Sequence, residues 1–294
     1  MTDPTPTDPM LADPRPTDPR PTDPRPSVPT PAALLEIAET VAREAAELAA
    51  RRRAEGVEVA ETKSSAVDVV TYTDREVETF VRQRLAELRP GDGFFGEEGE
   101  PDGSTTGLTW VVDPIDGTVN FVYGIPQWAV SIAVVEGGPD PLTWRALAAV
   151  VANPASGETF TASVGGGAWL GGRRLAVSSP PSLEQTLLAT GFSYDADRRV
   201  RHAEALVRVV GRVRDLRRFG AASLDLCAVA AGRVDAYVER GLKPWDHAAG
   251  VLVAAEAGAV VRGEVGQAPS ESLTFVASPT ISADLDDLVV ESGL

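Results

Sequence analysis

The sequence predicts an α+β protein in which helices and sheets are stacked in layers. Two observations lead to this prediction: a run of closely spaced strands between residues 109 and 163, and an alternation of strands and helices after Ser182. Such a pattern is typical of sheets packed against helices. With 294 residues, the chain can bury a sizeable core, in one large domain or two closely joined ones.

Residues 1–30 form a separate segment that is rich in proline and aspartate. This segment holds ten of the 23 prolines and no aromatic residue, and "DPRP" recurs between Ala12 and Pro26. Because it has so little apolar surface to bury, we expect it to be disordered, with polyproline II character. A docking tail is the alternative. A single folded domain is expected to occupy residues 31–294.

The folded part is expected to open with two helices. Thr30 is a plausible N-cap, followed by proline at the first helical position, and apolar residues then recur at helical spacing. A second helix is expected to begin at Thr73, with Glu76 three residues later completing a capping box. This start places Asp74 in the first turn of the helix.

The strands fall into two groups. Tight connections such as "EGGPDP" and "NPASG" predict an antiparallel meander for the first group. That group reads "TWVVD", "WAVSIAVVE", "RALAAVVAN" and "GETFTAS". The second group reads "TLLATGF", "VRDLRRF", "VDAYVER" and "LTFVASP", and helices are expected near residues 199–210, from Ala221, from Pro244 and near residues 281–291.

Composition narrows the class of protein and its partners. The net charge of −16 argues against nucleic acid or an anionic membrane as the main partner. No apolar run approaches the ~20 residues that a membrane span needs, and the N-terminus does not resemble a signal peptide. The single cysteine, Cys227, excludes an intrachain disulfide framework. We therefore expect a cytoplasmic protein.

Acidic residues stand at the ends or starts of the predicted elements. If the fold brings Glu97, Asp113, Asp116 and Asp246 together, four carboxylates share one pocket, and their pKa values shift unless cations are bound. Oxygen ligands without clustered His or Cys point to Mg²⁺, with Mn²⁺ as a substitute. The stretches are "GEE" (Glu97, Glu98), "DPID" (Asp113, Asp116) and "WD" (Asp246), and a fourth is "TYTD" (Asp74).

The segment "DPIDGT" combines carboxylates with a sharp turn. Its proline fixes a turn after the strand, so that Asp113 and Asp116 can face one site with the Ile115 carbonyl between them. The backbone amides of Gly117 and Thr118 open the next segment and suit a phosphate. Metal ligands beside an anion site predict metal-assisted hydrolysis of a phosphate ester.

The chain resembles the inositol monophosphatase family of magnesium-dependent, lithium-sensitive phosphatases, in its bacterial, actinobacterial form. The resemblance runs from Pro31 to the C-terminus. It implies a layered α-β-α-β-α sandwich of the inositol monophosphatase and fructose-1,6-bisphosphatase type, and a homodimer. The motifs that carry it are "KSSAVDVVTYTD", "FFGEE", "WVVDPIDGTVNFVYGIP", "FGAASLDL" and "ERGLKPWDHAAGVLVAAEAG".

The resemblance implies two or three magnesium ions. Glu97, Asp113 and the Ile115 carbonyl correspond to ligands of the tighter ion. Asp113 also bridges to a second ion, whose other ligands are Asp116 and Asp246. Glu97 would reach a third, weaker ion.

The remaining roles concern water and substrate. Asp74 and Thr118 correspond to the pair that orients the attacking water, and Glu98 to an acid beside the third ion. The Gly117 and Thr118 amides correspond to the phosphate cradle.

The part of the family site that contacts inositol hydroxyls corresponds to Glu239 and to the stretch Gly220, Ala221 and Ala222. Ala221 stands where animal members have threonine, so one hydroxyl contact would be missing. Lys63 falls in the family's mobile loop.

The leading functional hypothesis is hydrolysis of myo-inositol 1-phosphate by metal-activated water. An alternative keeps the chemistry but changes the substrate to fructose 1,6-bisphosphate, histidinol phosphate or a nucleotide 3′-phosphate. A second alternative is a non-catalytic regulatory or binding protein on the same scaffold.

Several other residues have simpler interpretations. His202 is expected to be exposed on an amphipathic helix, and His247 to be a helix residue with a role beside the metal site as the alternative. Cys227 is expected in the core. Arg217 and Arg218 either guide an anionic substrate or end a surface strand.

Removing residues 1–29 behind a new initiator methionine should leave the melting temperature and the phosphatase activity nearly unchanged. The segment offers little apolar surface for burial. The measurement is thermal unfolding of the full chain and the truncated chain in one buffer. A melting temperature lowered by several degrees in the truncated chain would show that the segment docks on the folded part.

Overall fold

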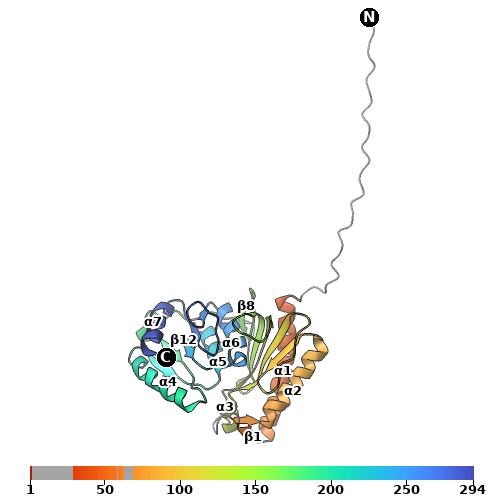
Figure 1. Ribbon diagram of the computed structural model, residues 1–294, viewed down its shortest axis with the longest axis horizontal. Coiled ribbons are helices and arrows are strands. Elements are labelled where there is room, and N and C mark those ends of the chain that lie inside the picture. Colours follow the sequence, from red (N-terminus) through yellow and green to blue (C-terminus); the bar gives the residue numbers. More distant parts are fainter. Residues whose placement is uncertain (2–28, 58, 63–68) are drawn as a thin grey trace.

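We describe the protein from a computed structural model, which covers residue 1 and residues 29–57, 59–62 and 69–294. The expectations for most of the proline-rich segment, and for Lys63, lie outside these described residues. Figure 1 shows two sheets with helices between them and on both outer sides. Within the described residues, no helix combines the length and apolar character needed to cross a bilayer.

The larger sheet has seven strands in the order β3-β4-β5-β6-β7-β8-β9. The strands from β4 onward pair antiparallel with their sequence neighbours, which confirms the predicted meander, and β3 pairs parallel with β4. Their bounds are β3 Gly93–Gly96, β4 Leu108–Asp116, β5 Ala129–Glu136, β6 Arg145–Asn153, β7 Glu158–Ser163, β8 Gly167–Leu170 and β9 Arg173–Arg174.

The smaller sheet has five strands in the order β11-β10-β12-β14-β13 and mixes parallel and antiparallel pairs. A third sheet contains only the antiparallel pair β1 and β2. The bounds are β1 Val59–Thr62, β2 Val69–Thr71, β10 Leu187–Ala189, β11 Asp215–Arg217, β12 Ala236–Glu239, β13 Val260–Arg262 and β14 Thr274–Ala277.

Seven α-helices and one 3₁₀-helix, η1, lie in the described part of the chain. Both α1 and α2 pack on one face of the larger sheet, and α4 and α7 pack on the far face of the smaller one. Their bounds are α1 Pro31–Glu55, α2 Tyr72–Leu88, α3 Thr118–Tyr123, η1 Leu183–Gln185, α4 Ala196–Val209, α5 Ala222–Ala230, α6 Pro244–Glu256 and α7 Ser282–Ser292.

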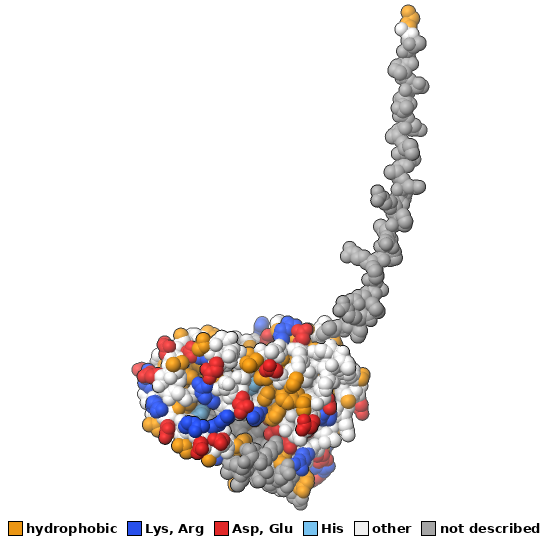
Figure 2. Space-filling model, in the orientation of Figure 1, with side chains coloured by type: hydrophobic (Ala, Val, Ile, Leu, Met, Phe, Trp, Pro, Cys, Tyr) orange, Lys and Arg blue, Asp and Glu red, His pale blue; other side chains and the backbone are white. Residues whose placement is uncertain are grey.

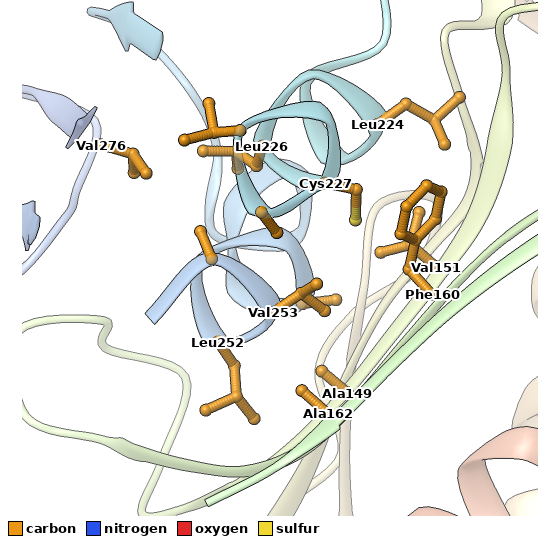
Figure 3. Packing of buried hydrophobic residues seen from close by; sticks show 14 of the residues in the cluster. Ala149, Val151, Phe160, Ala162, Leu224, Leu226, Cys227, Leu252, Val253 and Val276 are labelled. Atoms are coloured by element: carbon orange, nitrogen blue, oxygen red, sulfur yellow. The ribbon is translucent and has the colours of Figure 1, made fainter. Parts of the chain in front are cut away.

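The helices α5 and α6 form the central layer between the two sheets. Figure 3 shows Cys227 and Leu224 of α5 near Phe160 of the larger sheet, and Val276 of the smaller sheet on the opposite side of α5. The central strands are therefore buried on both faces, which explains their continuous apolar runs. These layers confirm the predicted α-β-α-β-α sandwich, and the buried Cys227 confirms a core position.

The start of α2 differs from the prediction. The helix begins at Tyr72 with Thr71 as its N-cap, and the capping box is closed by Asp74, whose carboxylate accepts a hydrogen bond from the Thr71 amide at 2.9 Å. Glu76 instead forms an ion pair with Arg52 of α1 at 2.7 Å. The helix begins earlier than predicted, so the third helical position falls on Asp74.

The prediction for His202 was wrong. Its side chain is 8% exposed, its Nε2 lies 3.0 Å from the Thr190 hydroxyl, and its ring packs edge-on against Phe192. His202 lies on the narrow buried side of α4 together with Ala205 and Val209. A histidine with a hydrogen-bond partner can therefore be buried there.

Candidate active site

The site is built where β4 ends. The pairing of β4 with β5 is regular up to Asp113 and resumes at Asp116, with a bulge between them. The bulge arises at Pro114, which cannot donate to the sheet. Both aspartates are buried, and Asp113 accepts a hydrogen bond from the Ile115 amide at 3.0 Å. The chain then turns through Gly117, whose φ of 89° favours glycine, into α3.

Two further acids approach from other layers. Glu97 follows β3, the strand beside β4, and Asp246 lies in the first turn of α6 in the central layer. The Asp246 carboxylate accepts a hydrogen bond from the Lys243 amide at 2.7 Å. The structure thus brings the predicted acids to one place, from three different elements.

Mutual repulsion is strong among these acids. Burial raises the pKa of Asp113 well above its ordinary value, and the charges of Glu97, Asp116 and Asp246 raise it further. The pKa of Asp246 is raised well above its ordinary value by burial and then by Glu97 and Asp116. The pKa of Asp116 is raised by burial, although the hydroxyl and amide of Ser223 act against that shift.

The donor set fits hard divalent cations. It consists of carboxylate oxygens and a peptide carbonyl, the ligands that Mg²⁺ prefers. Among the described residues, no three His, Cys, Asp or Glu side chains form a ready-made coordination group. In this geometry the Asp116 and Asp246 oxygens accept hydrogen bonds from Ser223 and from the Lys243 amide. These hydrogen bonds lower the pKa values of the two carboxyls, but burial outweighs them, so both pKa values remain raised.

Asp74 and Thr118 lie beside the acids and are hydrogen-bonded to each other. The Thr118 Oγ1 lies 3.1 Å from Asp74 Oδ1 and 3.1 Å from the Ile115 carbonyl oxygen. Burial raises the pKa of Asp74 to about 6, while its hydrogen bonds from Thr71 act in the opposite direction. The pair is therefore a buried hydroxyl and carboxyl held in a fixed relation.

The loop that carries Glu97 and Glu98 is held by Glu78 of α2, a residue that the sequence analysis missed. Its carboxylate accepts a hydrogen bond from the Glu98 amide at 2.7 Å and pairs with Arg82 at 3.2 Å. The Glu98 side chain is nearly buried and lies 4.0 Å from Arg75. No motif marks Glu78, because it occupies an ordinary helical position.

Glu239 ends β12 and is buried, and its carboxylate accepts a hydrogen bond from the Tyr237 hydroxyl. Burial raises its pKa to about 7, against the effects of Tyr237 and of the Arg218 charge. Residues two apart on a strand share a face, so Glu239 lies on the same face as Tyr237, which packs in the core with α5 and α6.

The acidic pocket opens at this place and has a volume of about 450 Å³. Glu97, Glu239 and Asp246 line it together with aromatic residues that the sequence did not mark, Phe192, Tyr194 and Trp245. A smaller recess of about 90 Å³ continues inward from the same acids. Its lining includes Asp116, Gly117, Gly220, Ala221, Ala222 and Arg218.

The structure distinguishes Arg217, at a strand end, from Arg218, which lies near the site. Arg217 pairs with Asp215 at a partly exposed strand end, whereas Arg218 lines the recess. Asp225 of α5 also lines the recess; its Oδ1 has no hydrogen-bond partner among the described residues, and burial raises its pKa well above the ordinary value. The sequence did not mark Asp225 as a site residue, because an aspartate in "SLD" resembles an ordinary helix residue.

His247 follows Asp246 and is buried. Its Nε2 has no hydrogen-bond partner within the described part of the chain, and burial lowers its pKa to about 4. The ring lies beside Trp144, with 6.2 Å between centroids. It therefore packs as a neutral core residue.

Known proteins are similar to this chain in sequence and in fold. The profile of the inositol monophosphatase family matches residues 31–290. The Inositol-1-monophosphatase SuhB of Mycobacterium tuberculosis is 45% identical over 271 residues, which cover 86% of this chain and 91% of that protein. The Nus factor SuhB of Pseudomonas aeruginosa is 43% identical over 239 residues, or 79% of this chain and 86% of that protein.

A solved structure of Mycobacterium tuberculosis SuhB superposes with a TM-score of 0.76 at 43% identity, over 90% of this chain and 98% of that one. The layered fold and the acidic site at the end of β4 are those of a phosphatase of the α+β sandwich class. Within that class, the chain belongs to the inositol monophosphatase family.

Replacing Asp113 with asparagine should raise the melting temperature in EDTA at pH 7.5 by about 2–4 °C for each kcal/mol of repulsion removed. Asparagine keeps an acceptor for the Ile115 amide and removes one of the repelling charges. The exposed Asp287→Asn variant of α7 makes the same change of charge and is the control. Equal shifts in the two variants would contradict local repulsion at the site.

Proposed function

We propose that the protein is a Mg²⁺-dependent phosphomonoesterase that hydrolyses myo-inositol 1-phosphate to inositol and phosphate. The observation that carries the proposal is the convergence of Glu97, Asp113, Asp116 and Asp246 beside the Asp74–Thr118 pair. A relative with 45% identity is named for the same reaction, which supports this substrate. Two or three ions and a homodimer are part of the proposal.

The roles of the residues follow from their chemistry. Glu97, Asp113, Asp116, Asp246 and the Ile115 carbonyl would hold the cations. Bound cations would lower the pKa of a water molecule and neutralise the phosphoryl oxygens. Hydrolysis forms a bond from the water oxygen to phosphorus and breaks the ester bond between phosphorus and the inositol oxygen, which takes up a proton.

Asp74 and Thr118 would orient the water for this attack. A hydroxyl has one proton, so Thr118 can donate to either Asp74 or the Ile115 carbonyl and still accept a hydrogen bond from water. The Asp74 carboxylate is the stronger acceptor of the pair when it is ionised. Glu98, in the loop after β3, would lie beside the third cation.

The substrate would enter between the two sheets. The amides of Gly117 and Thr118 would bind the phosphate, while Glu239 and the stretch Gly220 to Ala222 would face the ring. Ala221 offers no hydroxyl to the substrate. Fructose 1,6-bisphosphate, histidinol phosphate and nucleotide 3′-phosphates therefore belong in the same assay.

A regulatory role is the second candidate, because a relative with 43% identity is named a Nus factor. Such a role is compatible with phosphatase activity. If the wild-type protein hydrolysed none of the phosphate esters, the regulatory role would be the remaining candidate.

The wild-type protein should release phosphate from myo-inositol 1-phosphate in MgCl₂, and EDTA should abolish the release. Asp113→Asn should be inactive at saturating magnesium, because one carboxylate would serve two cations. Phosphate release is measured over the substrate panel, with Asp287→Asn as the folded control. Near-normal turnover by folded Asp113→Asn would contradict the assignment of the metal ligands.

Lithium should inhibit hydrolysis in the millimolar range, and excess magnesium should inhibit as well. Lithium is a small, hard cation that would compete for the oxygen ligands of the second ion, which include Asp116 and Asp246. The titration is run at fixed magnesium, with potassium chloride as the control for ionic strength. A flat response to lithium would remove this claim and leave the magnesium requirement intact.

Glu239→Gln should lower kcat/KM for myo-inositol 1-phosphate by roughly ten- to hundredfold, through loss of a charge-assisted hydrogen bond to a ring hydroxyl. A small phosphate ester without ring hydroxyls should be hydrolysed about as before. Because the pKa of Glu239 is about 7, wild-type Glu239 carries a proton at low pH, and the difference between the two proteins should shrink below pH 6.

Both substrates are assayed with both proteins between pH 5.5 and 8.5. Equal losses on the two substrates would mean that Glu239 supports the catalytic centre, and the role in recognising the polyol would be wrong.

A further inference from the structure

A second cavity of about 490 Å³ lies beside the acidic pocket and has the opposite character. Three arginines line it: Arg198 and Arg201 of α4, and Arg240, which follows β12. Its other lining residues are small or polar, namely Ser193, His202, Gly241, Glu271, Ser272 and Gly293. We call it the arginine cavity. Figure 2 shows a band of Lys and Arg side chains in the half of the molecule where Figure 1 places α4.

The positive charges of the cavity are only partly balanced. Arg198 and Lys243 share one carboxylate, that of Glu271, at 3.3 and 3.2 Å. Arg240 pairs with Glu264. Arg201 is exposed and forms no ion pair within the described residues. The cavity therefore has more guanidinium groups than carboxylates that could neutralise them.

The walls of the cavity are held in place. Arg240 donates hydrogen bonds to the carbonyls of Leu294 at 2.9 Å and Ser272 at 2.8 Å. The Thr190 hydroxyl gives its proton to the Val238 carbonyl, so it accepts from Nε2 of His202, which fixes the tautomer of that ring. A site with fixed walls loses little conformational entropy when it binds a ligand.

We propose that the arginine cavity binds the phosphoryl group of a small phosphorylated metabolite and is an effector site, separate from the site of hydrolysis. Guanidinium groups present paired N–H donors that match phosphoryl oxygens. The volume is within the range of small-molecule sites and exceeds what a lone phosphate fills. The hydroxyls of Ser193 and Ser272 suit a polar body on the ligand.

The site is connected to the acidic pocket through shared residues. Ser193, Arg198, Gly241 and Glu271 line both. A phosphoryl group would compete with Glu271 for Arg198. The Glu271 carbonyl also accepts a hydrogen bond from the Gly241 amide at 2.7 Å, and its carboxylate pairs with Lys243, the N-cap of α6. Binding of a phosphoryl group to Arg198 would therefore alter the ion pair between Glu271 and Lys243 at the start of α6, the helix that carries Asp246.

The test measures binding of inorganic phosphate and glycerol 1-phosphate by calorimetry in EDTA, where hydrolysis does not occur. Wild-type protein should bind glycerol 1-phosphate at one site. Arg201→Gln should weaken that binding by about tenfold or more through loss of a charge-assisted hydrogen bond. Arg199→Gln is the matched control, since Arg199 is an exposed neighbour on α4 outside the cavity lining.

A second control separates the two sites. Arg218→Gln changes the recess of the acidic pocket and should leave binding in EDTA unchanged. Absence of binding to wild type, equal weakening by Arg199→Gln, or weakening by Arg218→Gln alone would overturn the proposal. Tighter binding of phosphate than of glycerol 1-phosphate would overturn the metabolite assignment. Because the assay excludes catalysis, its outcome is independent of whether the proposed hydrolysis is found.

Discussion

The cost of placing several carboxylates in one buried site is the constraint on which the rest of this structure depends. Asp113, Asp116 and Asp246 are removed from water, Asp116 and Asp246 raise the pKa of Asp113, and Asp116 raises the pKa of Asp246. Unpaired buried charge costs several kcal/mol per group. The chain itself supplies amide dipoles from Ile115 and Lys243, and the hydroxyl and amide of Ser223. Dipoles orient the oxygens without cancelling their charge, and bound cations, as proposed above, would supply that compensation.

Packing between the layers provides the stability that offsets the cost of burying these acids. The two faces of β4 and β5 belong to different cores, one with α1 and α2 and one with the central helices. A strand packed on both faces cannot move its end residues without disturbing both cores. Packing on both faces therefore fixes Asp113 and Asp116 at the end of β4, while Glu97 comes from the loop after β3 and Asp246 from α6.

The parts of the structure that follow from regular patterns were predictable from the sequence. The strands of the meander and the site acids in "DPID" and "WD" have short-range signals that the fold preserves. Contacts between distant elements left no such signal. Glu78 reaches the Glu98 amide across 20 positions, and His202 is buried because Thr190 provides its partner. Glu239 is buried because both faces of β12 are covered by other layers, which the strand's own residues do not specify.

The residues of the site come from both sheets and from the layer between them. Glu97 follows β3 and Asp113 lies on β4 of the larger sheet, whereas Glu239 ends β12 of the smaller sheet. Asp246 comes from the central layer and lines the pocket together with Glu97 and Glu239. Ala221 precedes Ala222, whose amide donates a hydrogen bond to Asp116 at 3.2 Å. The stretch Gly220 to Ala222 is therefore tied to an acid on β4, which limits how far it can change. Glu239 belongs to the smaller sheet, so selectivity can change there with less effect on that acid.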